Sequence, residues 1–141
     1  MNSTNTISCG AGHVDDYSKV KDPRIHYVGV LNQKQLIAMY KKSDYFIHLA
    51  WIDHCPNVVV DARACDCQVI CSSAGGTREI AGTDAIVIEE EDWDYSPVNL
   101  YNPPKINFNK KLDNSKITCY TIDMKIVANK YVDFMKGTLN A

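Results

Sequence analysis

Two acidic residues and a pair of glycines are the groups in this sequence that could do chemistry. Asp53 and Asp61 lie eight positions apart, and Gly75-Gly76 follows the segment that contains them. Carboxylates can accept hydrogen bonds from ribose and sugar hydroxyls, and free N–H groups at the start of a helix can bind phosphates. On the residues alone, a simpler alternative stays open, in which Asp53 caps a helix and Asp61 is a surface residue.

The elements that must position these residues alternate between strand and helix. Residues 46–49 and 68–71 are short apolar runs typical of buried parallel strands. Pro56 predicts the first turn of a helix that runs to about Cys65, although Val58 to Val60 would also suit a strand. Further elements are expected as strands at 6–9, 25–28 and 85–88, and as helices at 33–42 and 77–81.

This alternation predicts an α/β fold with a Rossmann-like, doubly wound parallel sheet of about five strands. We expect a single domain over residues 1–141, with a nucleotide-binding core at 5–90 and an irregular excursion at 91–120. A C-terminal helix is expected at 121–138, capped by Thr121, ended by Gly137 and packed back on the sheet. Ligands in such sheets bind beyond the carboxyl ends of the strands.

The composition excludes several classes of protein. The 141 residues are 45% hydrophobic and 23% charged, with a net charge of -2, so nothing favours nucleic acid as a partner. No apolar run reaches the roughly 18 to 20 residues that a membrane span needs, and the first residues lack the features of a secretory signal. A cytoplasmic setting, or the cytosolic face of a membrane, is therefore expected.

The six cysteines are interpreted as reduced thiols because no signal peptide precedes them. A zinc site could recruit His54, Cys55, Cys65 and Cys67, but their spacing matches no standard zinc pattern. No metal site is therefore expected.

The segment LAWIDHCPNVVVDARACDCQVICSSAGGTREIAG resembles the signature of the C-terminal domain of GT-B-fold retaining glycosyltransferases of family four. That signature reads Glu-Gly-Phe-Pro-Asn-Val-Val-Leu-Glu-Ala, then Pro-Val-Ile-x-Ser and Gly-Gly-x-x-Glu-Ile. Upstream, ISCGAG, IHYVGV and KQLIAMYKKSD resemble the family's Gly-x-Gly strand end, its Val-x-Phe-Leu-Gly strand and its Glu-Leu-x-x-Leu-Tyr-x-x-Ala-Asp helix. The resemblance covers about residues 5–90 in the same order and spacing.

The resemblance implies a nucleotide-sugar donor site at the edge of the sheet. Asp53 would contact the donor sugar, with His54 beside it as a second catalytic candidate, and Asp61 would contact the nucleotide ribose. The other implied contacts are Cys55, Pro56 and Asn57 for the sugar and phosphates, Val30 and Leu31 for the base, and the turns at Gly10, Gly75 and Gly76 for the edge and floor of the site. Neither a metal nor a resident cofactor is implied.

The implied reaction transfers a hexose, with retention, from a UDP-, GDP- or ADP-hexose to a saccharide or a lipid-linked acceptor. An N-terminal acceptor domain, on the parent chain or on a partner chain, would complete the site. The chain is therefore expected to be part of a two-domain enzyme involved in polysaccharide or glycan biosynthesis.

The sequence departs from the family pattern at several positions. Asp53 and Asp61 both replace Glu, and His54-Cys55 replaces Gly-Phe. The Gly-Arg strand and Lys-Gly helix that neutralise the diphosphate in the family have no counterpart, which leaves the basic candidates Lys34, Arg63, Arg78 and Lys105. These departures favour an alternative, a non-catalytic Rossmann-like binding or assembly domain that has lost activity. His48 is interpreted as a hydrogen-bonded core histidine.

Overall fold

The computed structural model describes residues 22–90, 96–97 and 105–139. The chain divides into two compact units, residues 1–39 and 40–141, and each is described by itself. Helix α1 (Gln33–Tyr40) lies at the end of the first unit, and its last residue, Tyr40, belongs to the second. Asn32 caps this helix, because its Oδ1 accepts a hydrogen bond from Gln35 N at 3.0 Å and its own N–H donates to Gln35 Oε1 at 3.0 Å.

The strand predicted at residues 25–28 is not formed. These residues pair with no strand in the described part of the chain, and Ile25, Tyr27 and Val28 are exposed. A short apolar run becomes a strand only where a neighbouring strand supplies hydrogen-bond partners, and this prediction was wrong for that reason. The strand predicted at 6–9 lies outside the described residues.

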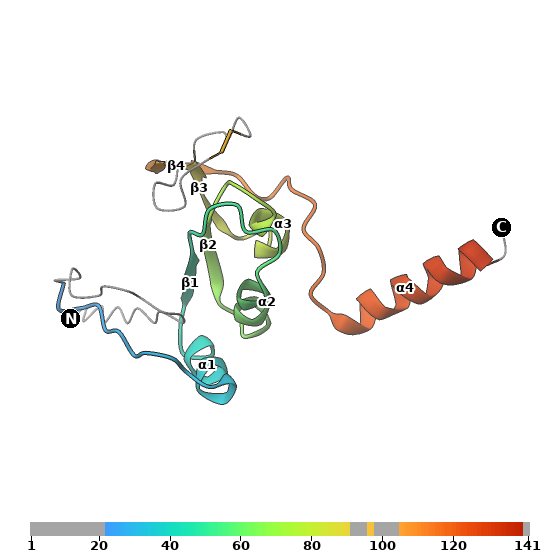
Figure 1. The fold of residues 1–141 in the computed structure, drawn as a ribbon, viewed down its shortest axis with the longest axis horizontal. Helices are drawn as coiled ribbons and strands as arrows, with labels where there is room; N and C mark the ends of the chain where they lie inside the picture. Colours follow the sequence, from blue (N-terminus) through green and yellow to red (C-terminus); the bar gives the residue numbers. More distant parts are fainter. Residues whose placement is uncertain (1–21, 91–95, 98–104, 140–141) are drawn as a thin grey trace. The chain divides into compact units, whose positions relative to one another are not determined.

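The second unit is built on a four-stranded open sheet in the order β1-β2-β3-β4 (Figure 1). The strands are β1 (Tyr45–His48), β2 (Gln68–Ser72), β3 (Ile86–Glu90) and β4 (Ile106–Leu112). The first three are parallel, and β4 runs antiparallel to β3 with a register shift between Ile88 and Glu89. The predicted α/β class and mainly parallel sheet are confirmed, with four strands among the described residues.

Strand β4 corrects the prediction of an irregular segment over 91–120. Its sequence, INFNKKL, carries Asn and Lys where an alternating apolar pattern would be expected, and most of its residues are exposed. An edge strand that pairs on one side and turns Lys to solvent has little hydrophobic signal, which explains why the sequence pattern missed it.

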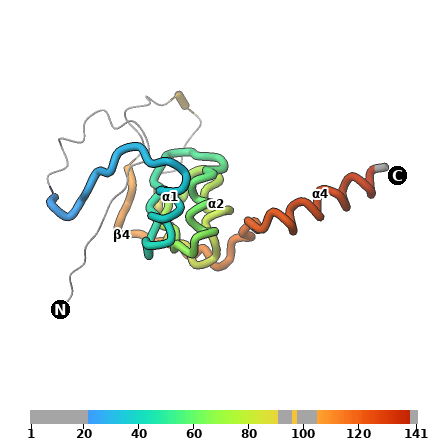
Figure 2. Tube along the Cα trace, turned by 90° about the horizontal axis from the view of Figure 1, so that it is seen from below, coloured from blue at the N-terminus to red at the C-terminus, as the bar shows by residue number. Residues whose placement is uncertain are grey.

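Helices α2 (Asn57–Ala64) and α3 (Thr77–Ala81) connect the three parallel strands. Both helices lie on the same face of the sheet, as Figures 1 and 2 show and as crossovers of one hand between strands in sequential order require. The core forms between this helix layer and the sheet. Its buried members are Val59, Val69, Cys71, Ile80, Ala81, Ala85 and Val87.

The valine run at 58–60 is helical, as predicted, although β-branched residues are poor helix formers. Val59 is fully buried, so tertiary packing outweighs the small propensity cost, which is about 0.5 kcal/mol per residue. Pro56 precedes the helix with φ of -69°, and its carbonyl accepts hydrogen bonds from Val59 N at 3.0 Å and Val60 N at 3.4 Å. Pro56 is thus the cap residue, one position before the predicted start.

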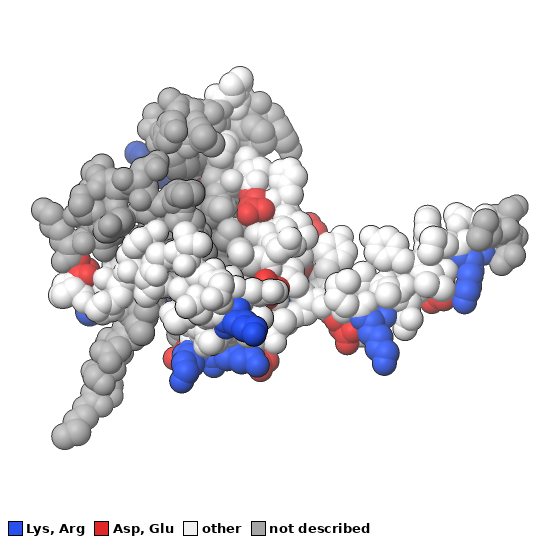
Figure 3. Space-filling model, turned by 60° about the horizontal axis from the view of Figure 1, so that its bottom comes forward, with Lys and Arg blue, Asp and Glu red and all other residues white. Residues whose placement is uncertain are grey.

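Helix α4 (Met124–Leu139) confirms the predicted C-terminal helix with different ends. Asp123, and not Thr121, caps it, because Asp123 Oδ1 accepts hydrogen bonds from Lys125 N at 2.8 Å and Ile126 N at 3.3 Å. Gly137 lies inside the helix and does not end it. The charged side chains of α4 gather along one side of the helix (Figure 3). None of the described side chains of α4 is buried, so packing of this helix on the sheet stays a prediction.

Two further observations concern the described residues alone. None of their helices is long and apolar enough to cross a membrane. Their five cysteines are free thiols, as expected; they are Cys55, Cys65, Cys67, Cys71 and Cys119.

Candidate functional site

The loop that carries Asp53 and the glycine turn meet at the carboxyl edge of the sheet. They follow β1 and β2, two adjacent parallel strands in which His48 pairs with Cys71. Gly76 N donates a hydrogen bond to Asp53 O at 3.0 Å, and Thr77 Oγ1 donates to the same oxygen at 3.3 Å. The structure therefore joins two features that the sequence places more than twenty residues apart, at the edge where ligands bind in such sheets.

Both glycines are required by the closeness of the two loops. Gly75 has φ of +75°, and a Cβ built on it would lie 2.6 Å from Asp53 O. A Cβ on Gly76 would lie 2.1 Å from His54 O. Any side chain at either position would push the two backbones apart, so the glycine pair permits the contact that fixes the Asp53 loop.

The Asp53 side chain makes a hydrogen bond with His48. His48 Nε2 and Asp53 Oδ2 are 3.2 Å apart, with side chains 16% and 36% exposed. Helix α2 has no side-chain cap, so the alternative in which Asp53 caps it is wrong. Sequence reasoning expected a hydrogen bond for His48 but missed its partner; the available signal was its place as the last residue of β1, at the edge where Asp53 follows.

Backbone strain precedes Asp53 in the same loop. Ile52 has φ of 49°, in the left-handed region that β-branched residues rarely adopt. Such a conformation costs on the order of 1–3 kcal/mol and persists only where the surroundings enforce it. Here the hydrogen bonds from Gly76 and Thr77 to the next residue provide that restraint.

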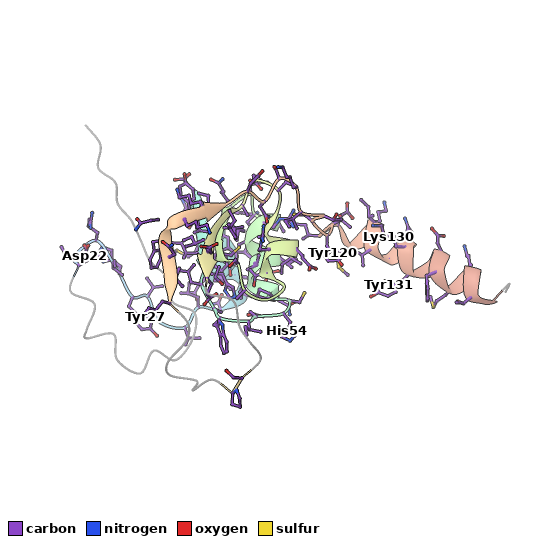
Figure 4. All side chains as sticks on the ribbon, turned by 90° about the horizontal axis from the view of Figure 1, so that it is seen from above. Asp22, Tyr27, His54, Tyr120, Lys130 and Tyr131 are labelled. Atoms are coloured by element: carbon purple, nitrogen blue, oxygen red, sulfur yellow. The ribbon has the colours of Figure 1, made fainter. Side chains whose placement is uncertain are left out.

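The remaining residues predicted from the loop and helix are mostly exposed. Asp61 is the fifth residue of α2, and no described residue makes a hydrogen bond or an ion pair with its carboxylate. His54 extends outward from its loop (Figure 4), with Cys55 and Asn57 also exposed. Asp61 therefore stands one helical turn inside α2 and free to accept hydrogen bonds from a ligand.

Three predicted residues cannot be joined to this edge. Val30 is exposed and Leu31 half-buried, and both belong to the first unit. Gly10 lies outside the described residues.

A cavity of about 650 Å³ lies beside the carboxyl ends of β2 and β3. It brings together Arg78 and Lys105, two of the basic candidates from the sequence, with Ser73 and Glu90 in the same lining. Glu90 is 5% exposed, and burial raises the pKa of its carboxyl, an effect that a hydrogen bond from Ser72 opposes. Positive charge is thus present at the same edge as the glycine turn.

A cavity of about 780 Å³ lies at the opposite, amino edge, next to Asp44 and Gln68. Because ligands of open α/β sheets bind at the carboxyl edge, the Asp53 edge is the candidate site, and residues at the amino edge can serve as controls.

Helix α3 is held in place by a buried network. Asn114 is 2% exposed; its Nδ2 donates to Gly82 O at 2.6 Å, and its Oδ1 accepts from Arg78 Nε at 3.2 Å. Tyr120 N donates to Glu79 O at 2.8 Å. These bonds join the segment after β4 to the helix that begins at the glycine turn.

Comparison with known proteins identifies one family. The family model for glycosyl transferases group 1 matches residues 19–96, which is more than half of the chain. The matched region contains the Asp53 loop, α2 and the glycine turn. No curated protein and no solved structure gives a significant match.

Proposed function

Because the chain belongs to the glycosyl transferases group 1 family, we propose that it provides the nucleotide-sugar donor site of a glycosyltransferase. The donor, a UDP-, GDP- or ADP-hexose, binds over the carboxyl ends of β1 and β2. The complete enzyme transfers the hexose to a saccharide or lipid-linked acceptor with retention of configuration. An acceptor domain, on the same chain or on a partner chain, covers the donor and completes the site.

The observation that carries this proposal is the way Asp53 is held. Its backbone oxygen accepts two hydrogen bonds from the start of α3, and its carboxylate contacts His48. A carboxylate fixed in this manner is ready to accept hydrogen bonds from sugar hydroxyls without first being ordered. Asp53 therefore orients the donor sugar, and the exposed Asp61 accepts hydrogen bonds from the ribose.

The diphosphate binds between the two acids. The first N–H groups of α2, at Asn57 and Val58, precede the residues that bond to Pro56 O, so they are available to phosphate oxygens at the positive end of the helix. Arg78 and Lys105 add positive charge at the same edge of the sheet. No divalent cation takes part in the proposed contacts, so EDTA should leave the donor affinity unchanged.

Calorimetric titration of UDP-, GDP- and ADP-hexoses tests the donor site. One of these ligands should bind. Asp61→Ala should weaken binding of the bare nucleotide, whereas Asp53→Ala should weaken binding of the nucleotide-sugar only. Asp44→Ala, which removes an exposed acid from the amino edge, is the matched control and should change neither affinity. Absence of binding at millimolar ligand by the folded protein would contradict the proposal.

The alternative function is a non-catalytic domain that keeps the fold for binding or assembly. Helix α4 favours it, because large apolar side chains are exposed there, among them Met124, Tyr131 and Phe134. Such a domain would fold normally and bind no nucleotide-sugar, so the same titration separates the two functions.

A further inference from the structure

We propose that His48 is a positioning residue for Asp53, holding the carboxylate in the orientation that receives the donor sugar. The ligand-binding part of this inference rests on the proposed function. The pairing itself rests on the described geometry, in which Nε2 of His48 and Oδ2 of Asp53 are 3.2 Å apart.

The His48 ring is held in place by aromatic neighbours. Phe46 and His48 lie two positions apart on β1, so their side chains share one face of the sheet. The two rings are stacked, with centroids 6.2 Å apart and planes inclined by 16°. Phe46 in turn makes an edge contact with Tyr40, which is 5% exposed and part of the buried interior. The imidazole is therefore a packed group and not a mobile surface histidine.

The chemistry of the pair determines which atoms are left for a ligand. An ionised carboxylate only accepts hydrogen bonds, so Nε2 of His48 must carry the proton and donate it to Oδ2. Oδ1 of Asp53 remains able to accept from a sugar hydroxyl. Gly76 N and Thr77 Oγ1 donate hydrogen bonds that hold the backbone oxygen of Asp53, and His48 holds its carboxylate.

His54, which the sequence favoured as a catalytic candidate, differs from His48 in every one of these respects. It is exposed, extends outward from the loop, and has no described hydrogen bond through its ring. It is adjacent to Asp53 in sequence, yet the described partner of the Asp53 carboxylate is His48.

The first test uses the free protein. In a ¹⁵N spectrum of the histidine rings, Asp53→Asn should move the Nε2 resonance of His48, whereas Asp61→Asn should leave it in place. An unmoved resonance in Asp53→Asn would overturn the pairing whatever the protein binds.

The second test measures affinity for the nucleotide-sugar and for the bare nucleotide. His48→Leu should lower the affinity for the nucleotide-sugar by about tenfold or more, as expected for loss of a hydrogen bond to a charged group. The affinity for the bare nucleotide should stay unchanged. His48→Gln should restore most of the affinity, because its amide nitrogen replaces Nε2 as donor. Asp44→Ala, which lies at the amino edge of the sheet, should change neither affinity.

A double substitution completes the argument. Adding His48→Leu to Asp53→Ala should cause no further loss, because the positioned group is already gone. Equal weakening of both ligands by His48→Leu, failure of His48→Gln to rescue, or additive losses would each overturn the positioning role. A wild-type protein that binds no nucleotide-sugar would instead contradict the proposed function, and the ring spectrum would still decide the pairing.

Discussion

Substitution of Gly76 by Ala probes the contact on which the site depends. A Cβ at this position would lie 2.1 Å from His54 O and 3.1 Å from His54 C. Non-bonded carbon contacts are most favourable at about 3.5 Å or more, so one of the two loops must move by more than 1 Å. That movement also separates Gly76 N from Asp53 O, which are 3.0 Å apart in the native loop.

The cost can be estimated from these two effects. Forcing a methyl group into a closely packed position costs about 1–3 kcal/mol. Loss of the hydrogen bond adds about 0.5–1.5 kcal/mol. We therefore expect Gly76→Ala to lower the free energy of unfolding by roughly 1.5–4.5 kcal/mol and to weaken nucleotide-sugar binding, because the Asp53 loop is displaced.

Urea unfolding followed by circular dichroism, together with calorimetry, measures both effects. The matched control is Gly137→Ala, because a Cβ on Gly137 meets nothing within 4 Å and the residue lies inside α4. That substitution should be neutral or stabilising by up to about 1 kcal/mol. A Gly76→Ala protein with the wild-type unfolding midpoint and wild-type affinity would refute the reasoning.

Three further substitutions or treatments test other parts of the structure. Burial raises the pKa of the Glu90 carboxyl, so the folded state favours the neutral acid. The stability that Glu90 contributes at low pH is therefore lost as the pH rises through the raised pKa. In urea unfolding measured across pH, Glu90→Gln should abolish that decline in stability, and an unchanged pH dependence would contradict the prediction. Burial also raises the pKa of the Cys71 thiol to about 11, so at pH 8 mass spectrometry should detect alkylation of the exposed Cys55 and none of Cys71 until the protein unfolds. Asn114→Ala should destabilise the fold by about 2 kcal/mol in urea, because buried hydrogen-bonding groups lose their partner, whereas the exposed Asn109→Ala should cost less than about 0.5 kcal/mol.

The elements that sequence reasoning predicted well are those with a local signal. The apolar runs that became β1 and β2 are short and continuous, and the helix after Pro56 begins with a residue of fixed φ. The glycine pair was also recognised, and the structure supplies the reason for it, since a Cβ would collide with the Asp53 loop.

The features that could not be predicted depend on partners far away in the chain. Strand β4 exists through its pairing with β3, although its own sequence is rich in Asn and Lys. The run at 25–28 has the opposite property, because its apolar residues have no pairing strand among the described residues. The bond between His48 and Asp53 depends on a turn whose shape is set by Gly76. Hydrophobic periodicity predicts which side of a helix or strand is buried, but it does not predict which other segment packs or pairs with it.

The measurement that tests the central claim most directly is a map of amide chemical shifts during titration with the nucleotide-sugar that binds. We predict that the shifted amides belong to residues 53–55, 57–58 and 75–77, at the carboxyl edge of the sheet, together with Asp61 on α2. Shifts confined to residues 41–45 and 64–68, around the cavity at the amino edge, would contradict the assignment of the donor site to Asp53 and the glycine turn.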